Sequence, residues 1–126
     1  MPSTTTCRRG EVVVVEVPFT GQAGSKARPA LVVSTEAFHK PLLDVIVCPI
    51  SSQPRNFERP GSGDHPLEHW RAAGLKYPST VRISNIVAVE KRIIKRILGR
   101  IATEDLAAVD EGLRRAFGLK APSRAA

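Results

Sequence analysis

Arginines and hydroxyl side chains at the ends of apolar segments are the residues of this sequence best suited to chemistry. Arg28 follows a glycine-containing segment and precedes an apolar run, Ser51 follows a second apolar run, and Arg82 alternates with apolar neighbours. The planar guanidinium of an arginine can donate hydrogen bonds to two phosphate oxygens at once, and it stays positively charged. Polar groups at strand ends, where loops converge, commonly build sites. These residues are therefore candidates for a site. From the pattern alone, however, we favour the alternative that Arg28 is a surface arginine and Ser51 only caps a turn.

Metal and cofactor motifs are absent from the sequence. It has no Cys-x-x-Cys pair, no glycine-rich phosphate loop and no histidine pair backed by glutamate at metalloprotease spacing. His65 and His69 are four residues apart, but Pro66 and the flanking glycines argue against a shared helical face, so we expect solvated loop histidines. The twelve acidic residues are scattered and form no paired-carboxylate cluster of the kind that a magnesium nuclease needs. We therefore expect no metal ion and no cofactor.

The charge balance favours a polyanionic partner. Nineteen lysines and arginines against twelve acidic residues give a formal net charge of +7, which attracts polyanions over long range. Nucleic acid is the commonest such partner, with an acidic protein or an anionic membrane surface as alternatives. No apolar run approaches the ~20 residues that a membrane helix needs, and segment 1–10 lacks the apolar core of a secretory signal. We expect a cytoplasmic protein without a membrane segment.

The two cysteines are expected to be free. Cys48 lies within an apolar run, where a buried and inert thiol is usual. Cys7 lies in a polar N-terminal tail. Two cysteines without a secretory signal do not form a disulfide framework.

The hydrophobic pattern predicts a mainly β chain. We expect strands at 11–17 (ended by Pro18), 29–34 and 44–50, a flexible loop at 20–27, a long loop or hairpin tip at 53–65, a short helix at 66–74, and one or two strands at 79–89. The strands at 29–34 and 44–50 barely alternate, which indicates burial on both faces. The segment 90–102 fits a basic amphipathic helix or a strand equally well.

The last part of the chain predicts a helix. Thr103 is a suitable N-cap with acidic residues after it, and Gly118 stands where a C-terminal glycine belongs. The apolar residues at helical spacing are Leu106, Val109, Leu113 and Phe117. Short strands with such a helix suggest a small, strongly bent sheet or barrel with a helix packed on it.

Five segments, taken in order, resemble the MazF/PemK toxins of type II toxin–antitoxin systems. They are RGEVVVV at 9–15, GSKARPALVVS at 24–34, VCPISSQ at 47–53, PSTVR at 78–82 and LGRIATEDL at 98–106. The resemblance spans residues 9–119, so we expect one domain there, with tails at 1–8 and 120–126. It implies a small SH3-like β-barrel of the CcdB/MazF type with a C-terminal helix. Chains of this family are expected to form homodimers.

The resemblance also implies an activity: metal-independent, sequence-specific cleavage of single-stranded RNA. The 2′-hydroxyl would attack the adjacent phosphate and leave a 2′,3′-cyclic phosphate and a 5′-hydroxyl. A separate antitoxin protein with a flexible acidic tail would neutralise the toxin. Two alternatives keep the fold without this chemistry: a CcdB-like toxin that binds DNA gyrase, and a basic barrel that binds nucleic acid without cutting it. A degenerate toxin that only binds its antitoxin is a third.

Residue by residue, the resemblance implies catalytic roles for Arg28, Ser51 and Arg82. RNA-binding roles are expected for Lys26, Phe19, Ser52, Gln53, Arg55, Phe57, Arg59, Lys76 and Tyr77, whose cations would follow phosphates and whose aromatic rings would stack on bases. For Trp70 we prefer packing. Many relatives carry Asp-Gln after the strand arginine, and the Kid-like branch uses that aspartate as a base. This chain has Ser84 and Asn85 there, so the resemblance assigns no base.

Overall fold

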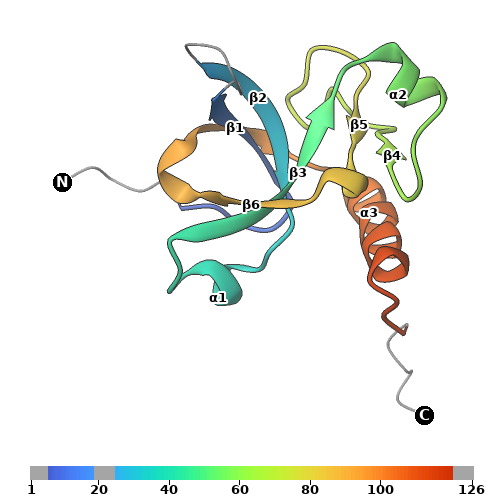
Figure 1. Cartoon of the computed structure of the whole chain (residues 1–126). Coiled ribbons are helices and arrows are strands. Elements are labelled where there is room, and N and C mark those ends of the chain that lie inside the picture. Colours follow the sequence, from blue (N-terminus) through green and yellow to red (C-terminus); the bar gives the residue numbers. More distant parts are fainter. Residues whose placement is uncertain (1–5, 19–24, 121–126) are drawn as a thin grey trace.

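A bent antiparallel sheet with a helix at one end forms the body of the protein in the computed structural model (Figure 1), which describes residues 6–18 and 25–120. The strands are β1 (Glu11–Pro18), β2 (Ser25–Val32), β3 (Asp44–Ser51), β4 (His65–Pro66), β5 (Thr80–Val81), β6 (Val87–Glu90) and β7 (Ile94–Arg100). The helices are α1 (Glu36–His39), α2 (Pro54–Glu58) and α3 (Thr103–Ala116), with 3-10 turns at Ile83–Asn85 and Lys91–Ile93. The predicted mainly β fold with a C-terminal helix is confirmed.

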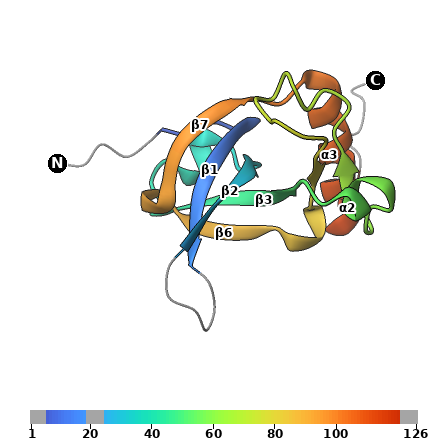
Figure 2. The same ribbon diagram turned by 90° about the horizontal axis from the view of Figure 1, so that it is seen from above.

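Strand β3 is the branch point of the sheet. The strand order is β4-β5-β3-β2-β1-β7, and β6 pairs with the first half of β3 while β5 pairs with its end. Register shifts between β1 and β7 mark irregularities of the kind that increase local twist. The sheet therefore curls around itself (Figure 2), although the strand ladder does not close into a complete barrel over the described residues.

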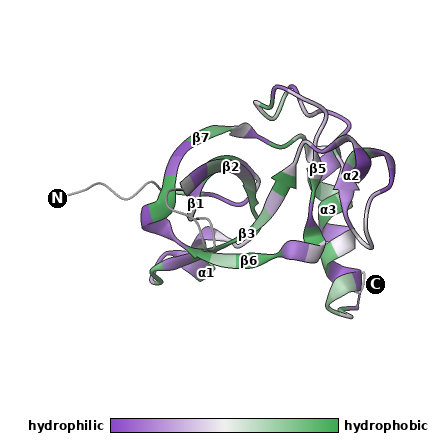
Figure 3. Cartoon of the chain, turned by 45° about the horizontal axis from the view of Figure 1, so that its top comes forward, coloured by the Kyte–Doolittle hydropathy of each residue, from purple (hydrophilic) through white to green (hydrophobic). Residues whose placement is uncertain are grey.

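Alternate residues of β1 build two hydrophobic cores on opposite faces of the sheet. Val12 belongs to the core that also receives Val109 of α3, and Val13 belongs to the other. The first core further contains Leu31, Cys48, Ile50, Leu67, Ala73, Val81, Ile83 and Ile101; the second contains Cys7, Val15, Ala30, Val32, Val45, Val47 and Ile94. Figure 3 shows hydrophobic residues along β3 and β6 and hydrophilic residues over α2. The central strands are buried on both faces because both cores need them.

Part of the segment predicted as a loop at 20–27 is strand in the structure, and its residues 20–24 lie outside the described part of the chain. Strand β2 already begins at Ser25, so Lys26 and Arg28 are strand residues opposite Val17 and Val15. Pairing with the valine-rich β1 outweighs the weak strand preference of these residues. The loop predicted at 53–65 contains α2, whose first residue is Pro54, because proline suits the first turn of a helix.

The helix predicted at 66–74 is wrong. The chain forms turns there because the Asp105 carboxylate accepts hydrogen bonds from the backbone N–H groups of Glu68 and His69, both at 2.9 Å. Gly74, at φ +88°, closes the turns against the carbonyl of Leu98, where a Cβ would lie 2.5 Å from the oxygen. The segment 90–102, which fitted helix or strand, contains strand β7. Trp70 is half-buried against the first core, in agreement with the packing role expected for it.

Three details at the ends of the chain correct the sequence analysis. The N-cap of α3 is Ala102 rather than Thr103, and Phe117 is 59% exposed although the other three apolar residues of its predicted face pack on the core. Cys7, expected in a polar tail, is buried in the second core. Gly118 has the predicted left-handed conformation, with φ +66°. Among the described residues, no helix combines the length and apolar character needed to cross a membrane.

Candidate functional site

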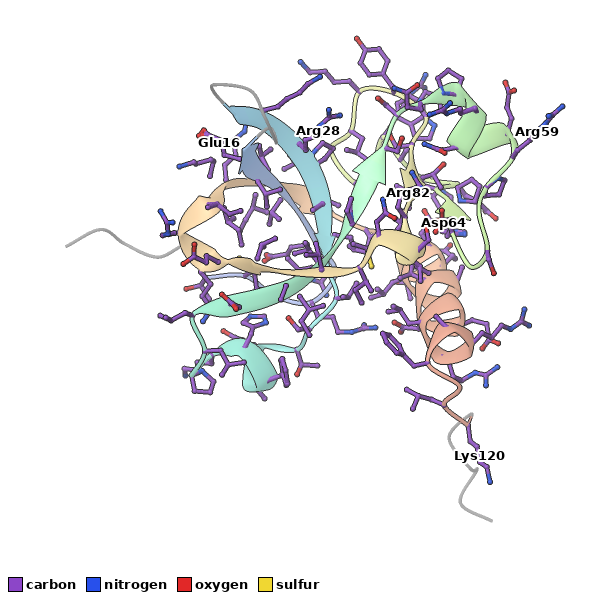
Figure 4. The ribbon with its side chains drawn as sticks, viewed as in Figure 1. Glu16, Arg28, Arg59, Asp64, Arg82 and Lys120 are labelled. Carbon is purple, nitrogen blue, oxygen red and sulfur yellow. The ribbon has the colours of Figure 1, made fainter. Side chains whose placement is uncertain are left out.

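Strand register places Arg28, Ser51 and Arg82 on one face of the sheet. Strand β2 pairs with β3 from Ala30 opposite Pro49 to Val32 opposite Val47, and Arg28 and Ser51 each lie two residues beyond the Ala30–Pro49 pair, at the same end of the two strands. On the other side of β3, Ser51 pairs with Thr80, and the backbone N–H of Arg82 donates to the carbonyl of Pro49 at 2.8 Å. Residues two apart on a strand share a face. Figure 4 shows the end of β3 between Arg28 and Arg82.

The Ser51 hydroxyl is held in place as an acceptor and keeps its proton for another partner. Its oxygen accepts from the side-chain amide of Asn56 at 2.8 Å and from the backbone N–H of Gln53 at 3.2 Å. A hydroxyl has two acceptor positions and one donor. With both acceptor positions filled, the half-buried Ser51 can donate to an oxygen that arrives from solvent.

Arg82 is anchored by a buried carboxylate. Its Nε donates to Asp64 at 2.8 Å, and Asp64 also accepts from the backbone N–H of Ser84 at 2.9 Å and from the Ser84 hydroxyl at 3.1 Å. The Asp64 side chain is 0% exposed and that of Arg82 is 27% exposed. Over the described part of the chain, the two terminal nitrogens of Arg82 make no hydrogen bond. The ion pair therefore orients the guanidinium and leaves its outer end free.

Arg28 is an exposed cation without an ion-pair partner among residues 6–18 and 25–120. Lys26, two residues earlier on β2, is likewise exposed and on the same face. The sheet face at the end of β3 therefore combines the charges of β2, the Ser51 donor and the free end of Arg82. Such a set of donors fits an anion with several oxygens, such as a phosphate diester.

Most of the other predicted binding residues lie on α2 or on the segments next to it and before β5. Ser52 and Gln53 are exposed between β3 and α2. Arg55 is exposed on α2, and Lys76 is exposed before β5. Phe57 and Tyr77 line one pocket. Arg59 ends α2 and points away from Arg28 and Arg82 (Figure 4), so it does not join the cluster. Phe19 lies outside the described residues.

His65 has a structural role, whereas His69 is exposed, as expected for a solvated loop histidine. His65, expected to be solvated, is half-buried, with Nε2 2.8 Å from Asp105, which ties β4 to α3. Burial alone would raise the pKa of the Asp105 carboxyl. The backbone N–H of Glu68, the His65 ring and the backbone N–H of His69 outweigh it, so that pKa is below its usual value. No group of residues suited to a metal ion occurs over the described part of the chain.

A buried serine–histidine pair is excluded from surface chemistry by its position. The Ser34 hydroxyl lies 2.8 Å from His39 Nδ1, and His39 Nε2 lies 2.8 Å from the carbonyl of Cys7. A carbonyl only accepts, so Nε2 carries a proton, and in the neutral ring Nδ1 then accepts from Ser34. His39 is 2% exposed, and its contact with the Cys7 carbonyl ties α1 to Cys7 of the second core.

Sequence reasoning missed Asp64 and Asn56. Asp64 stands in a loop rich in glycine and proline, and nothing in its local pattern marks a buried acid. Pro54, a suitable first residue of a helix, was a signal for α2, and α2 brings Asn56 back to Ser51. Both residues act by holding a predicted residue in place.

Solved structures of two endoribonucleases and of MazE–MazF share the fold. An endoribonuclease from a mycobacterial species superposes with a TM-score of 0.72 at 20% identity, over 94% of this chain and 98% of that chain. An endoribonuclease in complex with its cognate antitoxin, also mycobacterial, gives 0.69 at 21% identity, over 93% and 98%. A chain of the MazE–MazF structure from Deinococcus radiodurans gives 0.71 at 21% identity, over 92% and 100%.

The family assignment comes from the sequence itself. No curated protein matches the chain significantly. The profile of the PemK-like, MazF-like toxins of type II toxin–antitoxin systems matches residues 8–117, which is most of the 126-residue chain. The resemblance inferred from the five segments is thereby confirmed, and the chain belongs to the PemK-like, MazF-like toxin family of type II toxin–antitoxin systems.

Proposed function

We propose that this toxin is a metal-independent, sequence-specific endoribonuclease that cuts single-stranded RNA. The observation that carries the proposal is the set of donors on one sheet face, formed by Arg28, Ser51 and the free end of Arg82. Solved relatives of the same fold are named endoribonucleases. The described residues offer arginines and a hydroxyl at this place, which suits phosphate chemistry that relies on charge stabilisation.

RNA supplies its own nucleophile for this reaction. The 2′-oxygen forms a bond to the adjacent phosphorus as the bond from phosphorus to the 5′-oxygen breaks. The 2′-hydroxyl loses its proton and the departing 5′-oxygen gains one, which gives a 2′,3′-cyclic phosphate and a 5′-hydroxyl. Arg28 binds the phosphate and stabilises the negative charge that develops on its oxygens. Ser51 donates to the same phosphate, and the outer nitrogens of Arg82 supply the second cation.

Asp64 serves this site as a positioning residue. Its side chain is buried and therefore does not touch RNA, but it fixes Nε of Arg82 and the backbone at Ser84. Many members of the family carry an aspartate at the Ser84 position, which in this chain lies in the 3-10 turn Ile83–Asn85. In this chain the carboxylate reaches Arg82 and Ser84 from the loop before β4. We assign it to orientation and not to proton abstraction.

Partners follow from the same proposal. RNA held by cations releases condensed counterions, so affinity should fall steeply as salt rises. A cognate antitoxin with an acidic segment would neutralise the cationic face, as antitoxins are bound in the mycobacterial and Deinococcus radiodurans complexes. We also propose that the toxin is a homodimer and acts on RNA in the cytoplasm.

Cleavage of a long single-stranded RNA in excess EDTA tests the reaction. We expect discrete fragments with 5′-hydroxyl ends and 2′,3′-cyclic phosphates, and no cut at a site whose 2′-hydroxyl is replaced by hydrogen. Cutting of that 2′-deoxy site, or loss of activity with EDTA that returns with Mg²⁺, would overturn the mechanism. Intact RNA with folded, antitoxin-free protein would reject the nuclease, and RNA gel shift and gyrase supercoiling assays would then separate the binding-only alternatives.

A further inference from the structure

We propose that the pocket between α2 and the segment before β5 binds one guanine base of the RNA, and that Glu58 selects it. The pocket has a volume of about 290 Å³ and is lined by Ser52, Pro54, Phe57, Glu58, Tyr77 and Pro78. This inference rests on the proposed ribonuclease function and adds to it a specific base and the residue that selects that base.

The position of the pocket fits a base next to the bound phosphate. Its lining begins at Ser52, one residue after the Ser51 hydroxyl that we assign to the phosphate. The pocket is near the lower limit for small-ligand sites, roughly 300–1,000 Å³, which suits a single flat ring system better than a larger ligand. A strand held at Ser51 can therefore place one neighbouring base in it.

The apolar lining suits stacking. Phe57 is half-buried, Tyr77 is 64% exposed, and two prolines complete the walls. Bases of single-stranded RNA stack on exposed aromatic rings. The exposed ring of Tyr77 is thus available to a base that lies against it.

Glu58 is the polar group that can read the base. Over the described residues it makes no hydrogen bond or ion pair, although Arg55 and Arg59 belong to the same short helix region. An unpaired carboxylate on a surface that binds phosphates reduces affinity for RNA unless it makes a favourable contact. The Glu58 carboxylate only accepts hydrogen bonds.

Guanine matches that carboxylate best. Its Watson–Crick edge presents two adjacent donors, N1–H and the 2-amino group, which bind the two oxygens of one carboxylate. Adenine, cytosine and uracil each place an acceptor next to their donor on this edge, and an acceptor repels a carboxylate. A bidentate contact of this kind discriminates between bases by roughly 5- to 150-fold.

Two variants with the same charge change test the assignment. Glu58→Gln removes the acceptor pair, whereas Glu68→Gln removes an exposed carboxylate outside the pocket. Cleavage sites in a randomised RNA are mapped for each, and inosine, which lacks the 2-amino group, then replaces guanosine at the preferred position. We expect a required guanine for the wild type and Glu68→Gln, a loss of roughly 5- to 150-fold with inosine, and little response to inosine in Glu58→Gln.

Stacking is tested at the exposed ring. Tyr77→Phe keeps the ring and should keep the motif, whereas Tyr77→Ala should weaken binding of a 2′-O-methyl RNA, which cannot be cleaved, by roughly 5- to 150-fold. An unchanged motif and inosine response in Glu58→Gln, with cleavage intact, would overturn the guanine pocket and leave the nuclease standing. Guanine-selective binding by a wild-type protein that never cuts RNA would support the pocket and reject the nuclease.

Discussion

Replacement of Asp64 by asparagine probes the anchor of the candidate site. The substitution keeps the shape of the side chain but removes its charge. The asparagine oxygen can still accept from the backbone N–H of Ser84. Its amide nitrogen cannot accept from Arg82 or from the Ser84 hydroxyl, so two hydrogen bonds are lost. Arg82 is then a partly buried cation without a counter-charge.

The structure gives the expected size of the effect. Removing one partner of a fully buried ion pair costs about 3–5 kcal/mol. Arg82 is 27% exposed, so water compensates in part, and we expect a loss of about 2–3 kcal/mol in the free energy of unfolding. For a chain of 126 residues this corresponds to a fall in Tm of roughly 6–15 °C. RNA cleavage, measured well below Tm, should fall by up to about 10²-fold because Arg82 is misplaced.

Urea unfolding of matched variants measures this energy. The control is Glu90→Gln, which breaks the ion pair of Glu90 with Arg92, an arginine–carboxylate contact of 3.0 Å whose side chains are 51% and 76% exposed. An exposed pair contributes less than about 1 kcal/mol, so the control should stay near the wild type and keep its cleavage activity. If the Asp64→Asn protein is as stable as the Glu90→Gln protein, the reasoning that Asp64 anchors the site is refuted.

Three further predictions concern packing, thiols and pH. Gly112→Ala should destabilise the protein by about 1–2 kcal/mol in urea, because a Cβ 2.7 Å from the Gly63 carbonyl outweighs the gain in helix propensity; a more stable variant would contradict this. Burial, then the Asp64 charge, raises the pKa of Cys48 to about 12, so a thiol reagent at pH 8 should label it only after unfolding. Because the Asp105 pKa is lowered on folding, stability should fall as pH drops below about 4; an equally steep fall in Asp105→Asn would contradict this.

The sheet could be predicted from sequence where hydrophobic residues determine it. The valines of 11–17 and the apolar runs at 29–34 and 44–50 predicted β1, β2 and β3, because strands that serve two cores are apolar on both faces. The helix predicted at 66–74 failed because local spacing contains no information about Asp105, thirty or more residues later, which binds the backbone of Glu68 and His69. Long-range polar contacts override local preference there.

Some residues of the candidate site could likewise be predicted from the sequence, and others could not. Arg28, Ser51 and Arg82 stand beside apolar strands, so their positions could be predicted from the pattern and the family resemblance. Asp64 and Asn56 stand in segments that were predicted to be loops, and their roles depend on which side chains the fold brings to them. The charge on Glu58 had no assigned role until α2 placed it in a pocket with Tyr77.

The cleavage rate of Arg28→Ala is the most direct test of the central claim. The assay compares purified wild type, Arg28→Ala and Lys120→Ala on one RNA in excess EDTA. Lys120→Ala is the control, because it removes one positive charge far from the site (Figure 4). Circular dichroism first establishes that all three are folded. We predict that Arg28→Ala cuts about 10²–10³-fold more slowly while Lys120→Ala cuts at the wild-type rate. Folded Arg28→Ala protein that cuts as fast as Lys120→Ala would contradict the assignment of this sheet face as the catalytic site.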